Sequence, residues 1–479
     1  MPSIYIETFG CQMNEADSRY IAERALDAGY TVAHAAEDAN VVVLNTCTVR
    51  DSAERRAYGR MNHFNALKQR DPSLRLVVTG CLAEQDRDRM QTLAPHVDAV
   101  FGTRELVRLG DQLAAWSPAF RPSSFDTRAS RTAQDDKDGE MLRFAMGGTA
   151  DGVTTEFSHL RAFVTVQRGC SYYCTFCIVP HVRGRFDHRP RREILAETAE
   201  RVARGAREIV LVGQTVNAWH DASGADFGDL CRDVAALPGL ERLTFISPHP
   251  KDFTEKIIED LAAIPQLNPR IHLPLQSASD SLLRRMNRKY TLAAFDEKLR
   301  ALRSRLPGCA ITTDIIVGFP GETEEDFEAT LAYVRTGVFA NAFTFIYSPR
   351  RGTPAARFEQ LGKDVVFARF ERLVAAQNRI TRSYHESKVG SIVRALIAGD
   401  SKKDANKLTA KTPDNVTIVA PKTPDCGADR PWLDIAVEHG HVWGCFGTIV
   451  GHASRYSDPV TACAPVVDLT ALRLLPLRR

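Results

Sequence analysis

The sequence predicts an α/β protein in three parts: an N-terminal parallel sheet, a central barrel of six β–α units and a small C-terminal all-β domain. Short β-like runs alternate with helical patterns through the first two parts. A long amphipathic helix over 364–386 follows, and after it the pattern changes to short strands and turns. The 479 residues suffice for about two to four domains, and 44% hydrophobic with 25% charged residues is typical of globular proteins.

The N-terminal part contains three predicted strands that each end at a cysteine. "SIYIETFGC" ends at Cys11, "VVVLNTC" at Cys47 and "LVVTGC" at Cys81. Helical patterns separate the strands, and Asp17 or Ser18 is expected to cap the first helix. Because ligand sites in parallel sheets lie at the carboxyl ends of the strands, we expect the cysteines to share one site with an open fourth position. The alternative is three buried packing residues.

A polar stretch without periodicity separates this part from the central barrel. Central strands are expected over 162–167, 208–213, 242–247, 270–275, 310–318 and 342–348. The expected boundaries are 1–120 for the N-terminal domain, 121–156 for the linker, 157–387 for the barrel, 388–455 for the C-terminal domain and 456–479 for a tail. The chemistry of such a barrel is expected where its strands end.

The stretch "RGCSYYCTFCIVP", residues 168–180, follows the first central strand and carries Cys170, Cys174 and Cys177 in a C-x3-C-x2-C spacing. A closed zinc site, or an iron–sulfur cluster held by protein alone, uses four ligands. Three thiolates leave one metal position open for a substrate or an exchangeable cofactor. The alternative is a structural zinc knuckle, for which His181 is the nearest fourth ligand.

Polar side chains and a glycine mark other strand ends in the central part. Gln214 follows the second strand, Gln276 follows the fourth, Asp314 lies within the apolar fifth strand, and Gly318 ends it. A buried carboxylate needs a partner, and glycine permits close approach of a ligand. A polar ring at one end of an apolar barrel is the usual form of a ligand site. The alternatives are satisfied buried polar groups and, for Gly318, an ordinary strand–helix turn.

The C-terminal domain has a basic loop, "DSKKDANKL", with Lys402, Lys403 and Lys407, and Lys411 follows. The net charge of the whole chain is only +3, so any basic footprint for nucleic acid must be local. A small β-barrel with a basic loop is a common RNA-binding format. The alternative is a solvated lysine surface.

The start of the chain, "MPSIYIETFG", lacks the basic and apolar regions of a signal peptide, and no apolar run approaches the ~18 residues of a membrane span. We therefore expect a cytoplasmic protein without membrane contact. Its eleven cysteines should be thiols or metal ligands there. Five cysteines without ligand spacing are expected to be packing residues: Cys231, Cys309, Cys426, Cys445 and Cys463.

Taken together, these motifs resemble the methylthiotransferases of the radical S-adenosylmethionine superfamily, in the family's order of cluster domain, radical-SAM barrel and TRAM domain. "TFGCQMNEADS" is similar to the tRNA branch of the family. "CTFCIVP", "HLPLQS", "MNRKYT", "TTDIIVGFPGETEEDF" and "YSPRRGTPAA" also resemble family motifs. The family pattern V-P-x-x-R-G-x-E-x-S-R reads "VPHVRGRFDHR" here, with Phe186 at the glutamate, His188 at the serine and Asp187 as the candidate substitute.

The resemblance implies two [4Fe–4S] clusters. One would be held by Cys170, Cys174 and Cys177, and its open iron would bind S-adenosyl-L-methionine and cleave it to a 5′-deoxyadenosyl radical. The other would be held by Cys11, Cys47 and Cys81 and would carry the sulfur. Four residues are expected to position S-adenosylmethionine: Gln214, Gln276, Asp314 and Gly318.

The implied activity is radical methylthiolation at C2 of N6-isopentenyladenosine at position 37 of the tRNA anticodon stem-loop. Electron-donor and sulfur-donor proteins would be partners, and the TRAM-type domain would bind the RNA through Lys402, Lys403 and Lys407. Two alternatives share this chemistry: methylthiolation of threonylcarbamoyl-adenosine in tRNA, and of a ribosomal-protein aspartate. A different class of alternative is a non-catalytic metal-binding RNA-binding protein.

Overall fold

The computed structural model describes residues 1–48, 51–117 and 158–457. It divides into two compact units: Met1–Ser158 with Ile178–Arg185 form unit 1, and His159–Cys177 with Phe186–Arg479 form unit 2. The chain thus leaves unit 2 directly after Cys177, contributes a short segment to unit 1 and returns at Phe186. The expected linker over 121–156, and Cys463 in the expected tail, lie outside the described residues.

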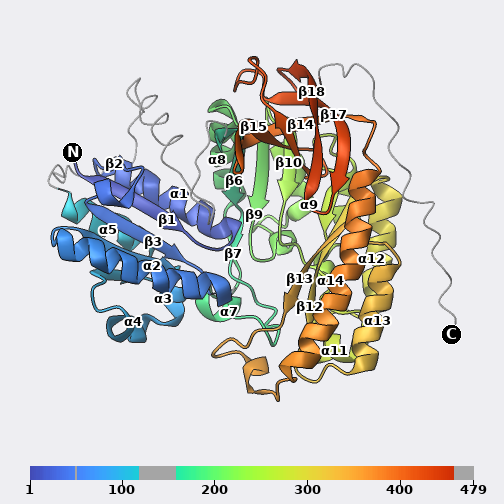
Figure 1. The fold of residues 1–479 in the computed structure, drawn as a ribbon, viewed down its shortest axis with the longest axis horizontal. Coiled ribbons are helices and arrows are strands. Elements are labelled where there is room, and N and C mark those ends of the chain that lie inside the picture. The colour runs from blue at the N-terminus through green and yellow to red at the C-terminus, as the bar shows by residue number, and fades with distance from the viewer. Residues whose placement is uncertain (49–50, 118–157, 458–479) are drawn as a thin grey trace. The chain divides into compact units, whose positions relative to one another are not determined.

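Unit 1 contains a five-stranded parallel sheet in the order β2-β1-β3-β4-β5. Alternate residues of the central strands face opposite sides, so Val41 and Val43 pack with α1 and α5, whereas Val42 and Leu44 pack with α2 and α4. Figure 1 shows the sheet between these helices. The elements are β1 (Ser3–Thr8), α1 (Gln12–Asp27), β2 (Thr31–Val32), β3 (Val41–Thr46), α2 (Asp51–Arg70), β4 (Arg75–Gly80), α3 (Cys81–Gln85), α4 (Arg87–Leu93), β5 (Ala99–Phe101) and α5 (Leu106–Trp116).

The first helix begins earlier than the sequence predicts. Cys11 is the N-cap residue of α1, and Asp17 and Ser18 are buried inside the helix, so their expected capping role is wrong. Their polar groups are used in the interior instead. Ser18 Oγ accepts a hydrogen bond from Asn45 Nδ2 at 2.9 Å, and Asp17 Oδ2 pairs with Arg183 Nη2 at 2.9 Å.

Unit 2 contains six parallel central strands, arranged as two three-stranded sheets in the orders β10-β9-β6 and β11-β12-β13. They are β6 (Arg161–Thr165), β9 (Glu208–Val212), β10 (Arg242–Phe245), β11 (Arg270–His272), β12 (Ala310–Val317) and β13 (Asn341–Ile346), close to the expected ranges. The sequence predicted a full or partial barrel; between β10 and β11 the described residues pair only through a Leu243–Leu267 bridge, so the two sheets do not share one continuous ladder. β11 has only three residues, so it offers few backbone groups that could extend this pairing.

Helices follow the strands of unit 2 as the alternation predicts. They are α8 (Arg191–Ala203), α9 (Phe227–Ala235), α10 (Glu255–Ala262), α11 (Asp280–Arg285), α12 (Leu292–Arg305), α13 (Glu324–Arg335) and α14 (Lys363–Glu386). Thr323 and Asp326 form a capping box at the start of α13. The short elements β7 (Gln167–Arg168), α7 (Val179–Val182) and β8 (Asp187–His188) flank the central cysteine loop in sequence, and α7 belongs to unit 1.

The C-terminal part of unit 2 is a closed five-stranded barrel in the order β14-β15-β16-β18-β17, drawn in orange to red in Figure 1. Its strands are β14 (Ile392–Ser401), β15 (Asp404–Lys411), β16 (Thr417–Pro421), β17 (Trp432–His441) and β18 (Gly444–Ala453). Trp432 Nε1 donates to Glu241 Oε2 at 2.8 Å and joins the barrel to the sheet region. None of the helices in the described part of the chain has the length and apolar character needed to span a membrane.

Candidate functional site

The three N-terminal cysteines lie at one edge of the unit 1 sheet. Cys11 follows β1, Cys47 follows β3, and Cys81 follows β4 as the first residue of α3; these strands are neighbours in the sheet. Cys47 and Cys81 are only 1% and 2% exposed, and Cys11 is half-buried. The expected convergence at the carboxyl ends of parallel strands is therefore present in the structure.

A buried hydrogen-bond network connects the segments that carry these cysteines. Asn14 Nδ2 donates to the carbonyls of Phe9 and Thr46 at 2.8 and 2.9 Å, next to Gly10 and Cys47. Asn14 Oδ1 accepts from Arg183 Nη2 at 2.8 Å, and Arg183 Nε donates to Cys81 Sγ at 3.3 Å. Burial raises the pKa of the Cys81 thiol, so a metal bound there must displace its proton.

The central cysteine loop is held first by the end of β9. Gln214 Oε1 accepts from the backbone N–H of Gly169, directly before Cys170. Thr215 Oγ1 lies 3.4 Å from Cys170 Sγ, and its backbone N–H donates to Gln167 Oε1 at 3.1 Å. Gln214 is thus a residue that shapes the loop. Burial also raises the pKa of the Cys170 thiol.

The "MNRKYT" segment holds the other side of the loop. Asn287 Nδ2 donates to the carbonyl of Tyr173 at 2.8 Å, and Thr175 N donates to the carbonyl of Met286 at 3.0 Å. Half-buried Arg288 donates from Nη1 to Cys174 Sγ at 3.4 Å. Burial opposes its charge, but Tyr290 and Cys174 raise the pKa of Arg288 above its ordinary value. Arg288 was not predicted as a site residue, although the "MNRKYT" motif that contains it was the signal that could have identified it.

The N-terminal region and the central region each match a known protein family. Residues 3–102 match Uncharacterized protein family UPF0004, and residues 164–334 match the Radical SAM superfamily. A curated tRNA-2-methylthio-N(6)-dimethylallyladenosine synthase from Anaeromyxobacter dehalogenans is 39% identical over 422 residues, covering 87% of each chain. Relatives of the same name are 38% identical in Syntrophotalea carbinolica, over 89% of this chain and 95% of that one, and 43% identical in Saccharopolyspora erythraea, over 84% and 80%.

This chain belongs to the family of these tRNA-2-methylthio-N(6)-dimethylallyladenosine synthases.

The fold has a counterpart among solved structures. The radical S-adenosylmethionine methyltransferase TsrM from Kitasatospora setae, solved with cobalamin and a [4Fe-4S] cluster bound, matches with a TM-score of 0.52. The match covers 74% of both chains at 15% sequence identity. At this identity the likeness supports the α/β fold with parallel sheets and says nothing of the ligands of this chain.

The other three residues expected to contact S-adenosylmethionine lie in three different local environments. Asp314 Oδ2 lies 3.1 Å from His272 Nε2, which identifies the partner that the sequence demanded for this carboxylate. Gln276 has a left-handed backbone with φ of 69° and a buried side chain. Gly318 donates its N–H to Glu322 Oε2 at 2.9 Å, and a Cβ there would lie 2.6 Å from Val366 of α14. The positive φ of +72° and the close Val366 side chain each account for glycine at this position.

The departures from the family pattern place aromatic rings beside the central loop. The Phe186 ring packs edge-on against Tyr172 at 5.5 Å, and the His188 ring lies 4.3 Å from that of His220. Tyr172 also packs against His249 at 4.4 Å. Burial lowers the pKa of His249 to about 2, so this ring is neutral. A cluster of rings therefore adjoins the loop where the family pattern has a glutamate and a serine.

The candidate RNA-binding lysines lie on the β14–β15 hairpin of the C-terminal barrel. Lys402 and Lys403 connect the two strands, and Lys407 on β15 pairs with Asp404 at 3.3 Å. Lys411 does not extend this surface in the same way: it is half-buried, its Nζ donates to Thr417 Oγ1, and desolvation lowers its pKa to about 8. The expected basic surface is therefore limited to the hairpin.

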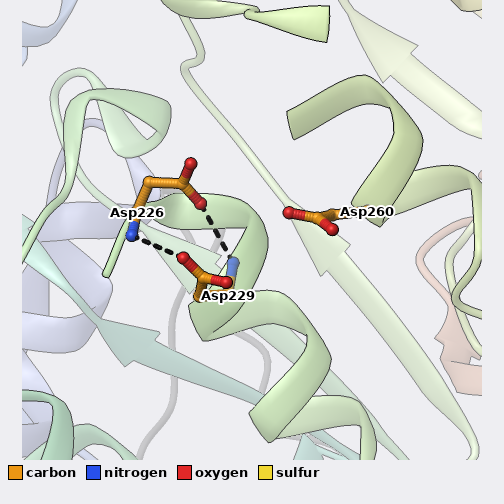
Figure 2. A group of neighbouring side chains, drawn as sticks. All are labelled: Asp226, Asp229 and Asp260. Atoms are coloured by element: carbon orange, nitrogen blue, oxygen red, sulfur yellow. Dashed lines mark hydrogen bonds between the residues drawn. The ribbon is translucent and has the colours of Figure 1, made fainter. Parts of the chain in front are cut away.

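One group of possible metal ligands proves to be an ion-pair network. In the described part of the chain, Asp226, Asp229 and Asp260 form the group whose ligand atoms all lie within 4.8 Å (Figure 2). Lys256 Nζ bonds to all three at 2.8–3.1 Å, and Arg232 pairs with two of them.

Gly10→Ala is expected to disrupt the N-terminal cysteine site. Gly10 has φ of +117°, and an added Cβ would lie 2.5 Å from Cys47 Cβ and 2.8 Å from its sulfur. If this site holds a [4Fe–4S] cluster, the variant should lose about four irons per chain, measured by iron analysis after anaerobic reconstitution. Gly59→Ala is the matched control, because nothing lies within 4 Å of its added methyl. Full iron content in Gly10→Ala would contradict the assignment.

Proposed function

We propose that this protein is a tRNA methylthiotransferase. It replaces the C2 hydrogen of N6-isopentenyladenosine at position 37 of the anticodon loop by a methylthio group, giving 2-methylthio-N6-isopentenyladenosine. The observation that carries the proposal is the 39% identity, over 87% of both chains, with a synthase named for this product. The radical SAM match over residues 164–334 supports radical chemistry and the use of S-adenosylmethionine.

We assign the radical chemistry to the central loop. Its three thiolates would hold a [4Fe–4S] cluster that, with bound S-adenosylmethionine, supplies a radical able to remove a C–H hydrogen that no side-chain base can remove. Arg288 and Thr215 would hydrogen-bond the ligand sulfurs, and Gln214 would fix the loop. Our candidates for contact with S-adenosylmethionine remain Gln214, Gln276, Gly318 and Asp314, the last oriented by His272.

The N-terminal cysteines fit a second [4Fe–4S] cluster that carries the transferred sulfur. Three observations support this assignment: the shared sheet edge, the burial of the cysteines and the neighbouring guanidinium of Arg183.

The two three-stranded sheets would act together as one open barrel, and the C-terminal barrel would be a TRAM domain that binds the tRNA stem-loop. We retain the sequence-based domain boundaries, the electron-donor and sulfur-donor partners and the cytoplasmic location as parts of this proposal.

Nucleoside mass spectrometry of tRNA tests the function. A strain lacking the gene should accumulate N6-isopentenyladenosine and lack its 2-methylthio derivative, and the wild-type gene should restore it. Unchanged 2-methylthio-N6-isopentenyladenosine in the deletion strain would refute the proposal. Loss of methylthiolated threonylcarbamoyl-adenosine, or of a modified ribosomal-protein aspartate, would instead identify the related activities. A metal analysis that finds about eight iron atoms per chain fits two clusters, whereas one or two zinc ions per chain would support a non-catalytic metal-binding protein.

Neutralising Lys402, Lys403 and Lys407 together to glutamine is expected to weaken tRNA binding. Each lost phosphate contact should reduce the slope of log affinity against log salt by roughly 0.7 to 0.9. Because Lys407 already pairs with Asp404, we expect a loss closer to two contacts than three. Titration of tRNA at several salt concentrations measures the slope. Lys363→Gln, at the exposed start of α14, is the control; an unchanged slope in the triple variant would mean that the hairpin is only a solvated surface.

A further inference from the structure

Arg183 follows the central cysteine loop in sequence but is buried in unit 1. It is 7% exposed, and its guanidinium faces the site of the N-terminal cysteines. Nε donates to Cys81 Sγ at 3.3 Å, and Nη2 donates to Asn14 Oδ1 at 2.8 Å and to Asp17 Oδ2 at 2.9 Å. A buried arginine is costly unless its donors are paired, and here a sulfur is one of the acceptors.

The segment around Arg183 leaves this side chain little freedom. Ile178 and Val182 form a small apolar cluster with Cys81, and the carbonyl of Val182 accepts from Thr103 Oγ1. Gly184 has φ of +81°, and a Cβ there would lie 2.4 Å from Arg104 Nη2. The backbone is thus anchored on both sides of Arg183, so the guanidinium is held at Cys81.

Asp17 and Asn14 fix the direction of the guanidinium. Both side chains are buried, at 1% and 0% exposure, and both accept from the same nitrogen, Nη2. Because the guanidinium is planar, holding Nη2 also holds the direction of Nε–H. The charge of Asp17 balances that of Arg183, and the Nε–H is directed at the Cys81 sulfur.

We propose that Arg183 is a positioning residue for the Cys81 sulfur and that its hydrogen bond raises the reduction potential of the cluster held by Cys11, Cys47 and Cys81. This inference rests on the second cluster of the proposed function. Hydrogen bonds to ligand sulfurs are among the determinants of the potential of iron–sulfur clusters, because they stabilise the more negative, reduced state. They also orient the ligand, as outer hydrogen-bond partners do at other metal sites.

The test uses the full-length chain with Cys170, Cys174 and Cys177 replaced by alanine, so that only the N-terminal cluster is observed. After anaerobic reconstitution, iron content and the midpoint potential from an EPR-monitored titration are measured. Arg183→Met should keep about four irons and shift the reduction equilibrium roughly tenfold, ~59 mV more negative for one electron. Arg183→Lys, which keeps the positive charge but lacks the planar guanidinium, should shift the midpoint potential less. Arg185→Met, two residues away and exposed, is the control and should not shift.

Each outcome decides the proposal. Arg183→Met with full iron and an unshifted potential would overturn it. If Arg183→Met loses iron, Asp17→Asn and Arg183→Lys provide the measurement: a negative shift in either supports the role, and no shift in both overturns it. A background variant that binds no iron would refute the second cluster itself and this role with it. A cluster that binds iron but whose midpoint potential does not depend on Arg183 would overturn the positioning role alone.

Discussion

Cys174→Ala is expected to abolish reductive cleavage of S-adenosylmethionine. Cys174 is 8% exposed, and its sulfur accepts a hydrogen bond from Arg288 at 3.4 Å. It belongs to the loop that the "MNRKYT" segment holds by hydrogen bonds. Removing one of three thiolates should empty that site, so iron should fall from about eight to about four per chain. Formation of 5′-deoxyadenosine, measured by mass spectrometry with a chemical reductant, should fall to the level without enzyme.

Cys309→Ala is the matched control for Cys174→Ala. Cys309 is also buried in unit 2, at 7% exposure, and lies directly before β12 rather than in the loop. It should keep full iron content and normal 5′-deoxyadenosine formation, with only the modest loss of stability that follows from truncating a core side chain. Unimpaired cleavage by Cys174→Ala would show that the loop does not hold the radical-generating cluster.

Cys47→Ala is expected to separate cleavage from product formation. Cys47 belongs to unit 1, and the radical-generating loop belongs to unit 2. The variant should therefore retain about four irons and continue to form 5′-deoxyadenosine. It should form no 2-methylthio product from tRNA containing N6-isopentenyladenosine, because the sulfur-carrying site would be lost. Both products are measured in the same reaction by mass spectrometry.

Val42→Ala provides the control within unit 1. Val42 is fully buried on the same strand, β3, so its truncation weakens the same core without removing a metal ligand. It should lower the free energy of unfolding but keep full iron and product yield. Normal methylthio product from Cys47→Ala would mean that the N-terminal cysteines are packing residues after all.

The strands and the cysteine positions could be predicted because they depend on local patterns. Apolar runs such as "VVVLNTC" and "LVVTGC" match the buried strands β3 and β4, whose carboxyl ends meet by the rules of parallel sheets. β2 and β5, of two and three residues, are too short to produce such a pattern. The near absence of hydrogen bonding between β10 and β11 depends on how two strands pair, so the sequence of either strand alone does not predict it.

The sequence by itself determined the α/β architecture, the two sets of three cysteines and the family resemblance. Only the tertiary structure decided which groups face the sulfurs. The partners of Cys81 and Cys174, Arg183 and Arg288, lie 102 and 114 residues away in sequence. It also showed that Asp17, expected to cap a helix, is the buried counterion of Arg183. The physical reason is that helix and strand patterns repeat over a few residues, whereas the pairing of a buried charge depends on which distant segment packs against it.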